Sequence, residues 1–204
     1  MLPEPKLRPS LAATPALHER AMENLRFIRE TMERSGSFTA VPGWGGAAMG
    51  ATALGAAYLA AREPTTAGWL RVWAVEALVA LALGAWGVRH KLRAARTPAL
   101  SGPAQRFVSS FAPPMLAGAL LTAALYQAGW TRVLPGLWLL IYGVAVITAG
   151  AFSVKIVPVM GGCFMALGAV ALFSPAGWGN GFMASGFGGL QIIFGIIIAR
   201  RYGG

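Results

Sequence analysis

Long apolar stretches without charged residues dominate the chain after residue 34. A charge at the centre of a bilayer is costly, and a spanning helix needs about 20 apolar residues, so charge-free stretches are candidate spans. Five occur: 35–61, 72–88 (interrupted only by Glu76), 107–131, 133–154 and 156–199. The last is too long for one crossing, and a turn-forming cluster rich in Gly, Ser and Pro at 174–181 divides it. The pattern predicts six transmembrane helices near residues 43–61, 69–88, 111–129, 133–153, 156–173 and 181–199.

The fold class follows from this pattern and is supported by the composition. Strands of a transmembrane β-barrel alternate in polarity, and these runs do not. Of the residues, 56% are hydrophobic and 12% charged, about half the charged fraction that a soluble domain uses to cover its surface. We therefore expect an all-α polytopic membrane protein. Its domains are a disordered N-terminus (1–14), an amphipathic cytoplasmic helix (15–35) and a six-helix transmembrane bundle (43–201).

The charge balance indicates how the chain is oriented. It has 17 Lys and Arg against 7 acidic residues, all Glu, and a net charge of +10. Such an excess is also typical of nucleic-acid binding. With six spans, however, 14 of the 17 basic residues fall on the side that holds both termini, and cytoplasmic loops are enriched in Lys and Arg. We expect both termini in the cytoplasm, a bacterial plasma (inner) membrane, the lipid bilayer as the main contact and no nucleic-acid partner.

The N-terminal segment has the pattern of an amphipathic helix. Thr14 and Pro15 form a start signal, and Ser35 with Gly36 forms a stop. Apolar residues recur at spacings of three and four, on one helical face: Leu17, Ala21, Leu25, Ile28 and Met32. Residues 15–34 contain four Arg and four Glu, so attraction to anionic lipid is weak. This face is expected to pack on the protein's own inner surface or the bilayer, or to dock a protein partner or a second copy.

A basic segment follows the second predicted span. It places four permanent charges in eight residues: Arg89, Lys91, Arg93 and Arg96. Each such charge beside a membrane contributes about 1 kcal/mol of attraction to an anionic inner leaflet. We expect these residues to anchor the topology and to contact anionic lipid or a partner.

Glu76 is the only acid within any predicted span. It lies about seven residues into its helix, hence about 10 Å from the outer end. Ionisable residues at such depth face a bundle interior or a water-filled cavity. Arg62 or Arg132 could pair with it, or a protonated Glu76 could hydrogen-bond to a Tyr or Thr of a neighbouring helix. A structural role and a role in handling a proton, cation or substrate both stay open.

Other polar and small residues within the spans fit helix packing. Gln191 and Tyr126 are polar candidates, and Gln191 is placed to reach the surroundings of Glu76. The first span carries a Gly46–Gly50 motif of the GxxxG type, which Ala47, Ala51 and Gly55 extend, while Ser185 and Gly189 continue the pattern in the last span. Such small residues let helices approach closely, and intramolecular contacts are preferred over a dimer here.

Motifs of soluble catalysis are absent from the sequence. It has no phosphate loop, no HExxH, no GxSxG and no Asp. The single Cys and two well-separated His residues exclude a cysteine zinc cluster. We expect no enzyme activity, no cofactor and no metal. The leading expectation is an accessory or scaffolding membrane subunit that acts through association, and the alternative is a small transporter or channel with Glu76 in its pathway.

Overall fold

The computed structural model describes residues 19–20, 22–28, 43–94, 102–151 and 153–202. Two compact units are present, Met1–Gly36 and Ser37–Gly204. In the first unit, residues 19–20 and 22–28 are helical, inside the predicted amphipathic segment. The predicted disordered segment 1–14, Leu17 and Met32 lie outside the described residues.

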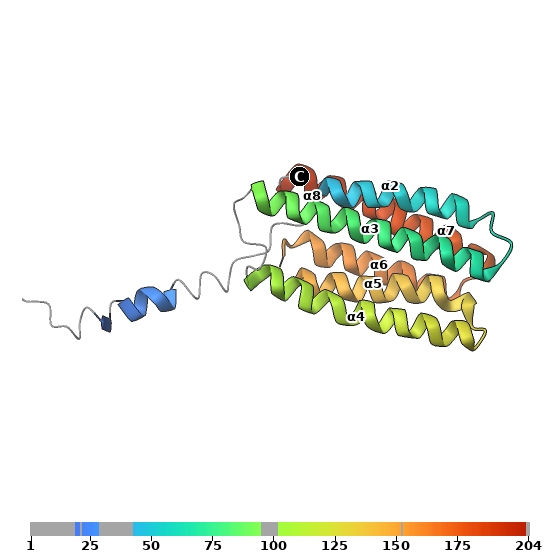
Figure 1. The fold of residues 1–204 in the computed structure, drawn as a ribbon, viewed down its shortest axis with the longest axis horizontal. Helices are drawn as coiled ribbons and strands as arrows, with labels where there is room; N and C mark the ends of the chain where they lie inside the picture. The colour runs from blue at the N-terminus through green and yellow to red at the C-terminus, as the bar shows by residue number, and fades with distance from the viewer. Residues whose placement is uncertain (1–18, 21, 29–42, 95–101, 152, 203–204) are drawn as a thin grey trace, which may run out of the picture. The chain divides into compact units, whose positions relative to one another are not determined.

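The described part of the second unit is built from helices joined by short turns (Figure 1). A last long helix is continuous through three parts, of which the middle one is π-helical. The helices are α2 (Gly43–Ala60), α3 (Thr66–Ala94), α4 (Gly102–Gln127), α5 (Leu134–Gly150), α6 (Ile156–Phe173), α7 (Gly179–Met183), the π-helical segment Ala184–Leu190 and α8 (Gln191–Tyr202). Single 3₁₀ turns, Thr131–Val133 and Ala176–Trp178, precede α5 and α7.

Five helices of the described chain are long and apolar enough to cross a membrane. They span Thr66–His90, Ala104–Gln127, Thr131–Gly150, Ile156–Phe173 and Ala176–Tyr202. The remaining helix, α2, is 18 residues long and uncharged, but 12 of its residues are Gly or Ala, which are less apolar than Leu or Ile. The chain is thus all-helical in its described part and has the helices of a membrane protein.

Two antiparallel helix pairs form the centre of the unit, and glycines set their spacing. On α5, Gly136, Gly143 and Gly150 recur every seven residues and face α6. A Cβ added at Gly143 would lie 2.7 Å from the carbonyl oxygen of Gly161, and one at Gly168 would lie 2.9 Å from that of Gly136. A seven-residue period keeps one face toward a partner helix, so the two backbones are in direct contact along their length.

The pair of α2 with the last helix repeats this arrangement. Gly43 and Gly50 of α2 face Ala199 and Gly188, and Gly46 meets Gly195. The predicted intramolecular contact of Gly46 and Gly50 is confirmed. The predicted extension of the ridge is wrong for Gly55 and Gly189, because a Cβ at either position would meet no atom within 4 Å.

The outer helices differ from the predicted bounds. Helix α3 continues to Ala94, so Arg89, Lys91 and Arg93 lie on the helix and not in a loop. Arg, Lys, Leu and Ala are good helix formers, and the next proline is Pro98.

Helix α4 begins at Gly102 and continues through two prolines. Because Pro114 has no N–H, the carbonyl of Ser110 loses its helical donor. The hydroxyl of Thr148 on α5 donates to this carbonyl at 3.1 Å. A neighbouring helix therefore supplies the missing partner and lets α4 pass the proline unbroken.

Gly143→Val should destabilise the bundle by about 1–3 kcal/mol, because the new side chain must displace the α6 backbone. The matched control is Gly162→Val on α6, where a Cβ meets nothing within 4 Å. Unfolding of the detergent-solubilised protein by SDS titration, followed by circular dichroism, measures both. Equal losses in the two variants would contradict the assigned glycine contact.

Candidate functional site

Glu76 lies deeper along its helix than the sequence indicated. Helix α3 begins at Thr66, three residues before the predicted start, so Glu76 is ten residues from its N-terminal end. At 1.5 Å per residue this is about 15 Å, and about 21 Å remain to His90 at the end of the apolar span. The side chain is 9% exposed. A carboxyl group therefore lies near the middle of the span.

Thr52 of α2 holds one oxygen of this carboxyl group. Its hydroxyl lies 2.8 Å from Glu76 Oε1 and 2.9 Å from the carbonyl oxygen of Met49. A hydroxyl has one hydrogen and two lone pairs. When Glu76 is ionised, Thr52 donates to it; when Glu76 is protonated, it donates to Thr52, and Thr52 donates to Met49. Rotation of one hydroxyl thus accommodates both protonation states.

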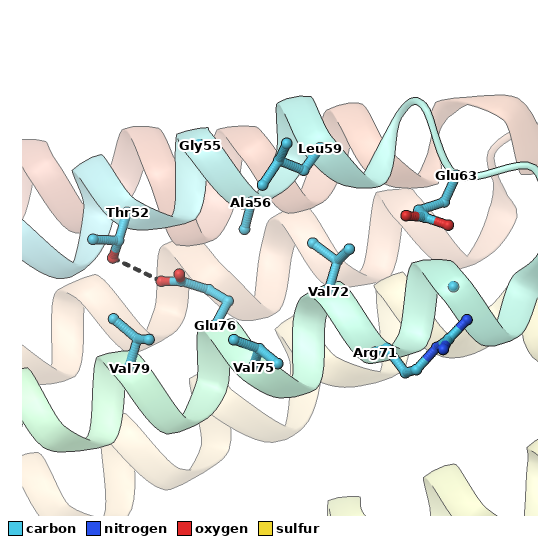
Figure 2. Close-up of a pocket in the computed structure, with 11 residues that line it drawn as sticks. Thr52, Gly55, Ala56, Leu59, Glu63, Arg71, Val72, Val75, Glu76 and Val79 are labelled. Atoms are coloured by element: carbon cyan, nitrogen blue, oxygen red, sulfur yellow. Dashed lines mark hydrogen bonds between the residues drawn. The ribbon is translucent and has the colours of Figure 1, made fainter.

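The second carboxyl oxygen is accessible from a groove between α2 and α3. Among the described residues, no buried side-chain oxygen lacks a hydrogen-bond partner, and Oε1 makes the one bond of this carboxyl group, so Oε2 is not fully enclosed. The groove has a volume of about 640 Å³. Figure 2 shows its lining, which comprises Thr52, Gly55, Ala56, Leu59, Glu63, Gly68, Arg71, Val72, Val75, Glu76 and Val79. It extends from Glu63 and Arg71, near the N-terminal end of α3, to Glu76.

No basic side chain of the described region pairs with Glu76. Arg62 donates to the hydroxyl of Tyr58 and lies over its ring, 3.8 Å from the ring centre. Arg71 points along α3 away from Glu76, and its Nε donates to the carbonyl of Ala67 (Figure 2). Of the expected alternatives, the geometry supports a hydrogen bond to a Thr of a neighbouring helix and not an ion pair.

The other predicted polar candidates lie elsewhere. Gln191 is buried and pairs with Tyr142 of α5, with its Nε2 donating to the Tyr142 hydroxyl at 3.2 Å. Neither residue lines the groove. Tyr126 is 44% exposed near the end of α4 and is also absent from the groove. The expected approach of Gln191 to Glu76 is replaced by a separate polar pair in the core.

Sequence reasoning missed the groove partner Thr52 and a polar centre at Asn180. The side-chain oxygen of Asn180 accepts hydrogen bonds from the indoles of Trp69 (3.2 Å) and Trp73 (3.3 Å), and its nitrogen donates to the carbonyl of Ala57 at 2.7 Å. The sequence places Asn180 in the turn-forming cluster 174–181 and gives it no further role. Its neighbours come from helices more than 100 residues away along the chain, so local sequence gives no signal for this role.

The network continues into α5 and α4. Trp69 stacks on Trp138 of α5, with ring centres 5.3 Å apart, and Trp138 donates to the Thr122 hydroxyl on α4 at 2.8 Å. A connected set of indoles, one amide and one hydroxyl thus joins α2, α3, α4, α5 and α7. Aromatic side chains with one polar atom are typical of the two interfaces of a membrane protein.

The predicted contact surfaces are only partly described. Arg89 and Arg93 are exposed on the last turns of α3, whereas the Lys91 side chain and all of Arg96 lie outside the described residues. Leu25 and Ile28 of the N-terminal helix are 61% and 51% exposed.

Neither a metal site nor a match to a known family helps to assign a function. No group of three His, Cys, Asp or Glu residues in that part is placed to hold a metal ion. No family model, curated protein or solved structure matches the chain. A function must therefore be argued from the geometry of the groove and its surroundings.

Asn180→Leu should lower the free energy of unfolding by about 1–2 kcal/mol, because two indole N–H groups lose their acceptor and the carbonyl of Ala57 loses one of its two donors. SDS titration of the purified protein measures this change. Gln127→Leu, which removes an exposed amide at the end of α4, is the matched control. Similar losses in the two variants would argue against the network.

Proposed function

We propose an integral membrane protein with six spans and both termini in the cytoplasm, in the plasma membrane of a bacterium. The uncharged helix α2 is the sixth span in addition to the five more apolar helices. Its close packing along the last helix supports this assignment, because glycines bring the backbones of these two helices into contact, as they do for α5 and α6. The excess of Lys and Arg at the ends of α3 and α8 supports the orientation.

Within this topology, the geometry best supports a small, non-enzymatic transporter or channel with Glu76 in its pathway. The observation that carries the proposal is that the two oxygens of the Glu76 carboxyl group lie in different environments. One oxygen is fixed by Thr52, and the other is reached from a groove that starts at the outer end of the bundle. An intramembrane acid that faces a cavity without a basic partner is typical of a proton or cation pathway.

Proton exchange is the simplest chemistry this arrangement supports. The hydroxyl of Thr52 can accept from the protonated acid or donate to the carboxylate, so Glu76 keeps a hydrogen bond in both states. Besides Glu76, the residues of the groove that carry charge are Glu63 and Arg71 at its outer end. Charged groups at a mouth keep water there, while the apolar lining below restricts passage to the carboxyl group.

Glu76→Gln should reduce proton flux at least tenfold in proteoliposomes, toward the level of empty vesicles. Glutamine keeps the size of the side chain and a hydrogen bond to Thr52 but cannot exchange a proton. An internal pH dye reports the flux after a pH step, with a potassium ionophore to clamp the potential.

Glu23→Gln is the control, because it neutralises an exposed acid of the N-terminal helix, outside the groove, and leaves the intramembrane acid intact. This variant should retain most of the flux. Wild-type vesicles with no flux above empty ones, or a Glu76→Gln variant as active as the wild type, would refute the transport proposal.

An accessory or scaffolding role through association is a second candidate. It is supported by Leu25 and Ile28 of the predicted apolar face of the N-terminal helix, whose side chains are more than half exposed. A helical face of this kind buries its apolar groups on a protein partner or a second copy.

Deletion of residues 15–34 should abolish co-purification of a partner or of a dimer from native membranes, because it removes the whole apolar face. The transmembrane unit is a separate compact body and should keep its helical content. Association that survives the deletion would assign the contact to another surface.

A further inference from the structure

We infer that the groove between α2 and α3 binds a lipophilic cation, a small molecule with a hydrophobic body and one positively charged group. The inference rests on the proposed role of Glu76 and names the chemical class of its ligand. Three features of the groove carry it: its size, the sign of its buried charge and the open space beside Gly55.

The size of the groove fits a small molecule. Its volume of about 640 Å³ lies within the range of small-ligand sites. The groove can therefore hold a small ligand, and its apolar lining selects a hydrophobic body.

The charge at the floor of the groove selects a cation. Glu76 is nine-tenths buried, and its Oε2 is open to the groove. Helix α2, which forms the opposite wall, carries no Lys, Arg, Asp or Glu. Arg71 lies toward the outer end with Glu63, so this acid and base balance each other at the mouth, and the one charge that the floor can carry is negative. Ion pairing in such an apolar environment is stronger than in water.

The wall of the groove leaves room for the ligand body. Gly55 lines it, and a Cβ at this position would meet no atom within 4 Å. Figure 2 places Gly55 on α2 one turn beyond Thr52, on the side toward the groove mouth. A cation bound at Glu76 can therefore extend its apolar body past Gly55 against Leu59 and Val72.

Tetraphenylphosphonium is a suitable probe, and tetraphenylborate is its control of nearly the same shape and opposite charge. Binding is measured by equilibrium dialysis against the full-length protein in nanodiscs, with empty nanodiscs to subtract partitioning into lipid. We expect saturable binding of the cation alone, and Glu76→Gln should weaken it at least tenfold.

Gly55→Leu tests the same groove without touching the acid. The leucine projects into open space and fills the volume of the ligand body, so it should also weaken binding at least tenfold. Gly162→Leu adds the same bulk to open space on α6 and should leave binding unchanged. Both variants are checked for the wild-type unfolding midpoint.

The outcomes separate this inference from the proposed transport function. Equal binding of cation and anion, or cation binding that neither Glu76→Gln nor Gly55→Leu weakens, overturns the inference. Glu76-dependent proton flux without saturable cation binding also overturns it while transport stands. Glu76-dependent and Gly55-dependent binding without proton flux supports the inference and refutes the transport function.

Discussion

The backbone contact of α2 with the last helix is the constraint on which the groove depends. Glycines at 43, 46 and 50 bring α2 against Gly188, Gly195 and Ala199, and backbone atoms of the last helix lie within 4 Å of a Cβ added at any of the three. That contact uses one face of α2 completely. Thr52 and Gly55 are thereby left on the face toward α3, where they form the wall of the groove. The position of the candidate site thus follows from packing on the opposite side of the same helix.

The absence of water in a bilayer explains why polar groups in the bundle occur in satisfied sets. Thr148 donates to the carbonyl of Ser110, which Pro114 leaves without a helical donor, and Gln191 pairs with Tyr142. Asn180 accepts from two indole N–H groups and donates to one backbone carbonyl. In each set the partners come from different helices, so the hydrogen bonds also fix which helices are neighbours. Glu76 differs from all three, because one of its oxygens is open to the groove.

Sequence patterns predicted the spans and the isolated acid, because both depend on local composition. Apolar runs mark five helices that the structure also has, and a charge inside such a run is visible without any contact. The limits of α3 were missed because basic residues that end a span do not end a helix. Thr52 and Asn180 were missed because their roles come from partners far along the chain. The GxxxG motif predicts that α2 approaches another helix closely at Gly46 and Gly50. It does not predict the seven-residue spacing of Gly43 and Gly50, which matches that of Gly188 and Gly195 on the last helix.

The energetics at Glu76 argue that packing alone does not account for this residue. Trp69, Trp73 and Glu76 follow one another at helical spacings of four and three, so the acid continues the stripe by which α3 faces its neighbours. A charged side chain at the centre of a spanning helix costs about 2.5–3.5 kcal/mol on insertion scales. One interhelical hydrogen bond returns about 0.6 kcal/mol and at most about 1.7. For the ionised form, the bond to Thr52 therefore does not offset the cost, and a leucine at this position is expected to make a more stable bundle. A residue that lowers stability and faces an open groove is better explained by what it binds than by what it holds together.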